Sequence, residues 1–299
     1  MKHLFRSSGI VFCVVMLSAS MAWGLINRFD VVTMDCTANG SDPHFCQPQF
    51  DQLNWWTSNG HYLAMGNDAK RPEVTAQSNA CAVYYDTLTD LYNSGYTGAQ
   101  AADQIQNYCV SNWSNNGVVP YWVVVNEIST SLWPGNATYR AWLINCMTRL
   151  HDTYGHANIL FSPFKNPFQN GADWQTLSAK TRIAIEGYLS GHDINASGNS
   201  VSWCQTQYQS FKNSYTGLGV ASSQLFIAEN YAQTVTGTNW GRSGVSYAGW
   251  DNAINARTTA QHNVGFAGSI GYGWGKNAMG TLEADMVHFE YTYATHALP

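Results

Sequence analysis

Two glutamates each follow a run of apolar residues, and together they could hydrolyse a glycosidic bond. Glu127 follows the run 119–125 and Asn126, and Glu229 follows the run 225–228. A buried parallel strand has a nearly continuous apolar sequence, and barrel enzymes place reactive groups at the carboxyl ends of such strands. Glycosidic cleavage needs a proton on the leaving oxygen and negative charge beside the developing oxocarbenium carbon. Two carboxyl groups with different pKa values supply both.

The elements that would position these glutamates follow from the alternation of short apolar runs with longer amphipathic stretches, which is typical of βα units. Seven strands are predicted at Phe29–Asp35, His61–Gly66, Val118–Glu127, Asn158–Pro163, Ile183–Ser190, Gln224–Asn230 and Phe266–Trp274. Helices are predicted at Gln47–Ser58, Val83–Asn93, Thr97–Asn112, Thr138–Tyr154, Ala172–Thr181, Ser202–Tyr215 and Ala248–His262. An eighth strand is expected either between Gly66 and Val118 or at Asp285–Thr292. Residues 25–299 contain no evident linker or repeat, so we expect one α/β domain, a (β/α)8 barrel of the TIM type.

In such a barrel the strand that carries Glu229 comes three strands after the one that carries Glu127. We therefore expect the two carboxyl groups to face each other across one mouth, both leaning inward. A separation of about 5–5.5 Å would indicate a retaining mechanism, and one of about 6.5–9.5 Å would indicate an inverting one.

This arrangement resembles the large clan of retaining glycoside hydrolases built on the (β/α)8 barrel. Members of that clan carry an Asn-Glu pair at the end of strand 4 and a second Glu at the end of strand 7. The resemblance implies that Glu127 is the acid/base, that Glu229 is the nucleophile and that Asn126 contacts the substrate. It also implies a Trp at the end of strand 8, for which Trp274 is the candidate.

The sequence departs from the clan pattern in two respects. Eight strands are not all evident, and the His-x-Tyr found on strand 6 of many members is missing. Tyr188 or His192 is the candidate substitute, and Asp35 at the end of the first strand is a candidate contact for an outer sugar.

Each of these residues also has a purely structural interpretation. Glu127 and Glu229 could be solvated carboxylates at strand ends, Asn126 could cap a turn, and Trp274 could fill the barrel mouth. Glu186 lies inside its predicted strand, so a buried ion pair with Arg182 or another partner is expected there.

Composition and charge limit the classes of partner that the protein could have. Residues 1–24 have a basic start, an apolar run and small residues at their end, as in a secretory signal peptide. Without them, twelve basic residues remain against 19 acidic ones, a net charge of −7 that argues against a nucleic-acid partner. No later stretch is long and apolar enough to span a membrane. Aromatic residues make up 14% and charged residues 11% of the chain, which favours a neutral carbohydrate as substrate.

Six cysteines follow the signal segment, and an even number in an exported chain favours disulfides. Proximity along the chain predicts the pairs Cys36–Cys46 and Cys81–Cys109, which leaves Cys146 to pair with Cys204. The sequence contains no CxxC pair and no zinc-like His spacing, and its Gly-rich stretch 265–275 lacks a nucleotide-binding pattern. We therefore expect neither a metal nor a cofactor.

The sequence thus predicts a secreted, extracellular or periplasmic, retaining glycoside hydrolase that cleaves a neutral polysaccharide or oligosaccharide. Three alternatives remain open: an inverting hydrolase, a transglycosylase that uses the same carboxylates, and a carbohydrate-binding barrel without activity. The sequence leaves the oligomeric state open.

Overall fold

The structure is a computed structural model, and it describes residues 27–32, 62–65, 80–84, 88–114, 118–125, 127–230 and 245–272. The predicted signal segment, the helix expected at 47–58, the alternative strand at 285–292 and the Cys36–Cys46 pair lie outside the described residues. No helix within the described ranges is long and apolar enough to cross a membrane.

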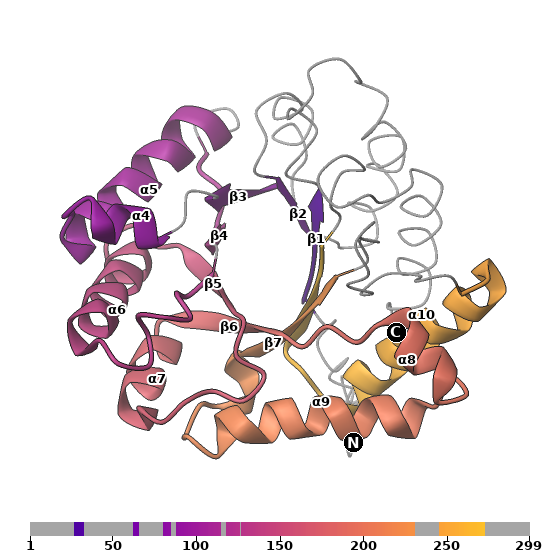
Figure 1. The fold of residues 1–299 in the computed structure, drawn as a ribbon. Helices are drawn as coiled ribbons and strands as arrows, with labels where there is room; N and C mark the ends of the chain where they lie inside the picture. The colour runs from indigo at the N-terminus through magenta and orange to yellow at the C-terminus, as the bar shows by residue number, and fades with distance from the viewer. Residues whose placement is uncertain are drawn as a thin grey trace, which may run out of the picture.

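Within the described residues, eight parallel strands pair in chain order, and β8 pairs back onto β1 to close a barrel (Figure 1). Each of the seven predicted strands is found, with shifted bounds. The strands are β1 Asn27–Val32, β2 Tyr62–Met65, β3 Ala80–Tyr84, β4 Trp122–Val125, β5 Ala157–Ser162, β6 Thr181–Glu186, β7 Leu225–Asn230 and β8 Gly268–Tyr272.

The missing strand is β3, which lies between Gly66 and Val118, the first of the two expected places. The helix predicted over Val83–Asn93 is therefore wrong at its start, because Val83 and Tyr84 pair with β4. This addition makes the strand after residue 118 the fourth and the strand after residue 224 the seventh.

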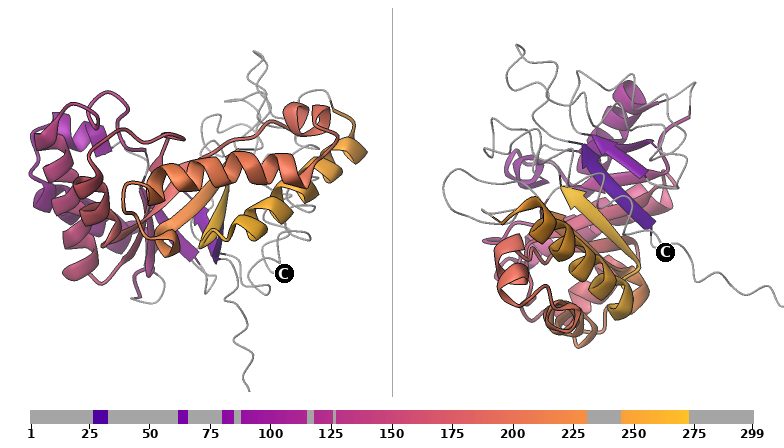
Figure 2. Two further views of the ribbon diagram at one scale, coloured as in Figure 1. Left: turned by 90° about the horizontal axis from the view of Figure 1, so that it is seen from below. Right: turned by 90° about the vertical axis from the view of Figure 1, so that its right-hand side faces the viewer.

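Helices line the outside of the wall from β3 to β7 (Figure 1), and α9 runs alongside α10 (Figure 2). Hydroxyl groups cap several helix starts: Thr97 forms a capping box with Gln100, and Ser190, Ser200 and Ser246 accept from backbone N–H groups. The helices are α4 Leu88–Asn93, α5 Gly98–Trp113, α6 Ala137–Asp152, α7 Gly171–Ser178, α8 Gly191–Ala196, α9 Val201–Thr216 and α10 Tyr247–Val264, with a 3-10 turn at Ser222–Gln224.

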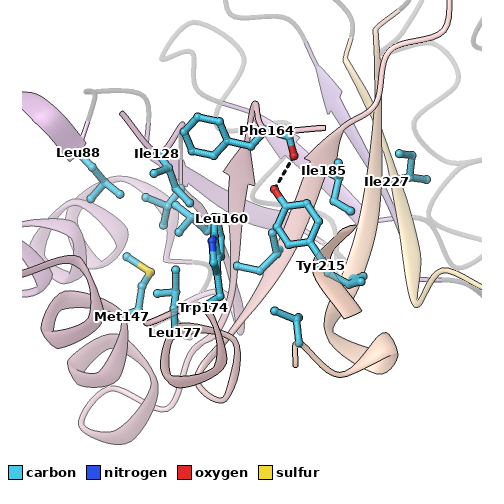
Figure 3. Close-up of a cluster of buried hydrophobic side chains, with 14 of the residues drawn as sticks. Leu88, Ile128, Met147, Leu160, Phe164, Trp174, Leu177, Ile185, Tyr215 and Ile227 are labelled. Carbon is cyan, nitrogen blue, oxygen red and sulfur yellow. Dashed lines mark hydrogen bonds between the residues drawn. The ribbon is translucent and has the colours of Figure 1, made fainter. Parts of the chain in front are cut away.

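The strands separate two apolar clusters, because successive side chains of a strand point to opposite faces. One cluster fills the barrel and comes from strand residues: Trp122, Val124, Ile159, Phe161, Ala184, Phe226, Ala228 and Ile270. The other lies between the strands and the helices, and its strand residues include Val123, Val125, Leu160, Ile183, Ile185, Leu225 and Ile227. Figure 3 shows part of this outer cluster, in which Tyr215 donates to the Phe164 carbonyl at 2.7 Å.

The two disulfides predicted within the described part of the chain are wrong. Cys109, Cys146 and Cys204 are free and buried. The cysteines lie on α5, α6 and α9, where they pack in the outer cluster as small apolar side chains. Proximity along the sequence misled the pairing, because these positions are buried separately in the packing of the outer cluster.

Candidate active site

Glu127 and Glu186 meet at the carboxyl ends of β4 and β6. Glu127 lies two residues beyond the last residue of β4, and Glu186 is the last residue of β6. Glu186 pairs in register with Ala228, and both alternate with outward-facing neighbours, so Glu186 projects into the barrel. Parallel strands of a barrel end at the same face, where the reactive groups of barrel enzymes lie.

The two carboxyl groups are within hydrogen-bonding reach of each other. Glu186 is 7% exposed, whereas Glu127 stands at the exposed rim with its carboxyl group partly enclosed. The Tyr188 hydroxyl also hydrogen-bonds to Glu186. The second oxygen of Glu186, Oε1, is buried and accepts no hydrogen bond from any described group. A buried carboxyl oxygen in this condition favours the protonated form or a ligand.

Burial, and after it the neighbouring Glu127, raise the pKa of Glu186, while Tyr188 and Lys165 oppose the shift. The result is a pKa of about 8. Burial also raises the pKa of Glu127, but the hydrogen bond from Glu186 counteracts this effect. Two carboxyl groups this close cannot both ionise readily, so they share a proton at neutral pH, and the more buried Glu186 holds it.

Glu229 does not lie in this site. It comes one residue after the inward-facing Ala228, so it points outward, and it is 0% exposed. Tyr208 on α9 and Gln261 on α10 donate to its Oε1, the latter at 2.8 Å, and Arg257 on α10 lies 3.5 Å from its Oε2. The expectation that Glu127 and Glu229 lean into one mouth is therefore wrong for Glu229, because strand alternation turns its side chain toward the helices.

The remaining predicted site residues fall into two groups. Tyr188 lies beside the carboxyl pair and packs against the apolar cluster inside the barrel. His192 is exposed in the first turn of α8, and the described contacts of the carboxyl pair do not include it. Asp35, Asn126 and Trp274 lie outside the described residues, so their predicted roles remain predictions.

Glu186 is a second residue for which the expectation from the sequence was wrong. The suggested ion pair with Arg182 does not form, because Arg182 donates to Gln224 near the other end of the barrel, and the partners of Glu186 are Glu127 and Tyr188. A signal was present: Arg182, Ala184 and Glu186 alternate with Ile183 and Ile185. Small and polar residues thus occupy one face of β6 and large aliphatic residues the other.

Among the residues that the structure describes, no three His, Cys, Asp or Glu side chains converge as metal ligands. The chemistry that this pair can perform is proton transfer together with attack or charge stabilisation by a carboxylate.

No protein-family model matches the sequence, and a search of curated proteins gives no match. Solved structures of similar fold include the C-terminal domain of a putative chitinase from Desulfitobacterium hafniense DCB-2, with a TM-score of 0.59, 12% identity and coverage of 91% of this chain and 99% of that one. The spore cortex-lytic enzyme SleL of Bacillus megaterium QM B1551 matches with a TM-score of 0.55 and 10% identity over 90% and 73% of the two chains. A Rhizomucor miehei β-1,3-glucanosyltransferase matches with a TM-score of 0.50 and 11% identity over 87% and 91%. At these identities the likeness shows a shared barrel fold.

Proposed function

We propose that this protein is a retaining glycoside hydrolase whose catalytic pair is Glu127 and Glu186. The observation that carries the proposal is the contact between these carboxyl groups at the carboxyl ends of two barrel strands, with the proton held on the buried partner. Similar barrels occur in a putative chitinase and a β-1,3-glucanosyltransferase, both named for action on carbohydrates. This likeness supports a carbohydrate as substrate.

The roles follow from where the proton resides. Glu186, with its raised pKa, donates its proton to the glycosidic oxygen as the bond to the leaving group breaks. Glu127, closer to solvent and ionised, attacks the anomeric carbon and forms the glycosyl-enzyme. In the second step Glu186 removes a proton from water, which displaces Glu127. This assignment gives Glu127 the nucleophilic role instead of the acid/base role that the clan resemblance implies.

The contact between the two groups also favours retention over inversion. An inverting site holds its carboxyl groups about 6.5–9.5 Å apart because a water molecule must fit between one of them and the sugar. Carboxyl groups that interact through a hydrogen bond lie nearer to the retaining separation of about 5–5.5 Å than to the inverting one, and a bound sugar would part them to it.

We further propose that the protein is exported and acts as a single domain on a neutral polysaccharide or oligosaccharide. Tyr188 would face the sugar beside Glu186, and Asn126, Asp35 and Trp274 retain the substrate-binding roles predicted for them. The apolar barrel interior beneath the pair supports a weakly charged site.

The test begins with a panel of aryl glycosides and neutral polysaccharides to identify a substrate. A 2-deoxy-2-fluoro glycoside with an activated leaving group should then inactivate the enzyme, and peptide mass spectrometry should locate the label on Glu127. Glu186→Ala should keep the first step, formation of the glycosyl-enzyme, on activated aryl glycosides but lose turnover, and azide should rescue turnover with a glycosyl azide of retained configuration. A label on Glu229, or a product of inverted configuration, would contradict the assignment.

A further inference from the structure

Glu229 lies at the centre of a buried polar cluster on the helix side of the barrel wall. Its carboxyl group accepts from Tyr208, Gln261 and Arg257, and Gln261 also donates to the Tyr208 hydroxyl at 3.3 Å. These partners come from α9 and α10, the two helices that pack together behind β7. Burial raises the pKa of Glu229, while Arg257 and the donors around the carboxyl group oppose that shift and favour its carboxylate form.

The same cluster also forms hydrogen bonds with the backbone that follows β6. The Leu189 N–H donates to Glu229, and the Leu189 carbonyl accepts from Arg257 Nη1 at 3.4 Å. The backbone N–H and carbonyl of Leu189 are therefore both bound by the buried Glu229–Arg257 ion pair. Leu189 is also the residue next to Tyr188, whose hydroxyl hydrogen-bonds to Glu186.

Two further contacts fix this segment from other directions. Lys165 Nζ donates to the Tyr188 carbonyl at 3.2 Å. Gly187 lies so close to β7 and α9 that a Cβ there would come within 2.5 Å of Ile227 Cδ1 and 2.9 Å of Phe211 Cδ2. The chain between Glu186 and α8 is therefore packed closely against the barrel wall. It is held by contacts at Gly187, at the Tyr188 carbonyl and at Leu189.

We infer that Glu229 is a positioning residue, which holds Leu189 and thereby sets the Tyr188 hydroxyl against Glu186. The inference rests on the proposed function of the Glu127–Glu186 pair. Glu229 acts from the outer face of the barrel wall on a group of the inner face, and the segment 187–189 is the connection. Hydrogen-bonded partners of this kind orient catalytic groups without contacting the substrate.

The effect of Glu229 on Glu186 can be measured as a change in the pKa of Glu186. Glu186 is faced by Glu127, Tyr188 and Lys165, which together with burial are the main causes of its pKa shift. Glu229 is faced by Arg257 and Tyr208, and its charge is felt at Tyr188 and Cys204. Loss of the Glu229 charge would by itself lower the pKa of Glu186, whereas loss of the Tyr188 hydrogen bond would raise it, so a rise on neutralising Glu229 is transmitted through Tyr188.

The experiment follows the Glu186 carboxyl by NMR of the ¹³C-glutamate-labelled protein between pH 4 and 10, in the wild type, Glu229→Gln, Tyr188→Phe and the double variant. Each single variant weakens or removes the Tyr188 hydrogen bond, which favours the ionised form, so the pKa of Glu186 should rise in both. The double variant should show no larger rise than Tyr188→Phe alone. Lys212→Met is the matched control, because Lys212 is a buried α9 residue whose hydrogen bonds go to the Val264 and Gly265 carbonyls.

The outcomes separate the inference from the proposed function. An unchanged Glu186 titration in a folded Glu229→Gln protein, or additive shifts in the double variant, would overturn the positioning role. If Glu229→Gln does not fold, Arg257→Lys keeps the positive charge but removes the guanidinium that contacts both Leu189 and Glu229, and it should raise the pKa of Glu186 in the same way. Full activity in Glu127→Gln or Glu186→Gln would instead overturn the catalytic pair, whatever the titration shows.

Discussion

Glu186 and Glu229 lie on neighbouring strands but point to opposite sides of the barrel wall. Glu186 pairs with Ala228, and Glu229 is the next residue along β7, where it pairs with Gly271 of β8. A shift of one residue along a strand moves a side chain from one face to the other. The inner glutamate is available for proton transfer in the barrel mouth, and the outer one fixes the segment that follows β6.

The rate should depend on pH through the carboxyl pair. We expect a bell-shaped profile of kcat/KM with a basic limb near pH 8, because Glu186 must be protonated to act as the acid. The acidic limb should lie above pH 4.5, because Glu127 must be ionised and burial raises its pKa. In Glu186→Gln, the first step on an activated aryl glycoside should lose the basic limb. A rate that stays constant from pH 7 to 9.5 in the wild type would argue against Glu186 as the acid.

Glu186→Gln should stabilise the protein in a pH-dependent way. The folded state raises the Glu186 pKa from its ordinary value of 4.5 to about 8, so the wild type loses stability as the pH rises through this interval, and the neutral amide does not. The gain should be absent below pH 4.5 and reach a few kcal/mol above pH 8, at about 1.4 kcal/mol per pKa unit. Urea unfolding at pH 4, 6 and 8.5 measures it.

Asp152→Asn is the control of opposite sign for that experiment. Lys180 and His151 lower the pKa of Asp152, so its contribution is present at neutral pH and is lost as the pH falls through its depressed folded-state value. The asparagine variant should therefore lose a little stability at pH 7 and none in acid. If Glu186→Gln behaved like Asp152→Asn, the Glu186 carboxyl would be ionised and stabilised in the folded state.

Gly187→Ala should lower both stability and activity. Its Cβ would overlap Ile227 and Phe211, and moving the segment away would displace Tyr188 from Glu186. Overpacking of this kind costs about 1–3 kcal/mol of unfolding free energy. Thermal unfolding and kcat on the same preparation measure both effects. Gly135→Ala is the matched control, because nothing lies within 4 Å of a Cβ there, and it should change stability by less than about 0.5 kcal/mol.

Cys109, Cys146 and Cys204 should resist alkylation in the native protein. They are buried free thiols, and burial raises the pKa of Cys109 and of Cys204 to about 12 and that of Cys146 still further from its usual range. Since the thiolate is the reactive form, iodoacetamide at pH 8 should leave them unmodified until denaturant is added. Peptide mapping that recovered a Cys146–Cys204 disulfide would contradict the structure.

Much of the fold could be predicted from the sequence, because strands buried on both faces are strongly apolar and alternate with amphipathic helices. Seven strands were located, and the ends of the fourth and seventh were recognised as carrying Glu127 and Glu229. β3 was missed because Ala80–Tyr84 is short and rich in alanine, so its composition favours helix as much as strand.

The face on which each glutamate lies was decided by the tertiary structure. Leu225, Phe226, Ile227 and Ala228 are all apolar, so β7 shows no alternation from which the direction of Glu229 could be read. Which side chains of β7 point inward is decided only when β6 and β8 pair with β7 and place Ala228 inside the barrel. The meeting of Glu127 with Glu186 depends on closure as well. The sequence by itself determined that carboxylates end these strands, and the closed barrel determined which two of them share a proton.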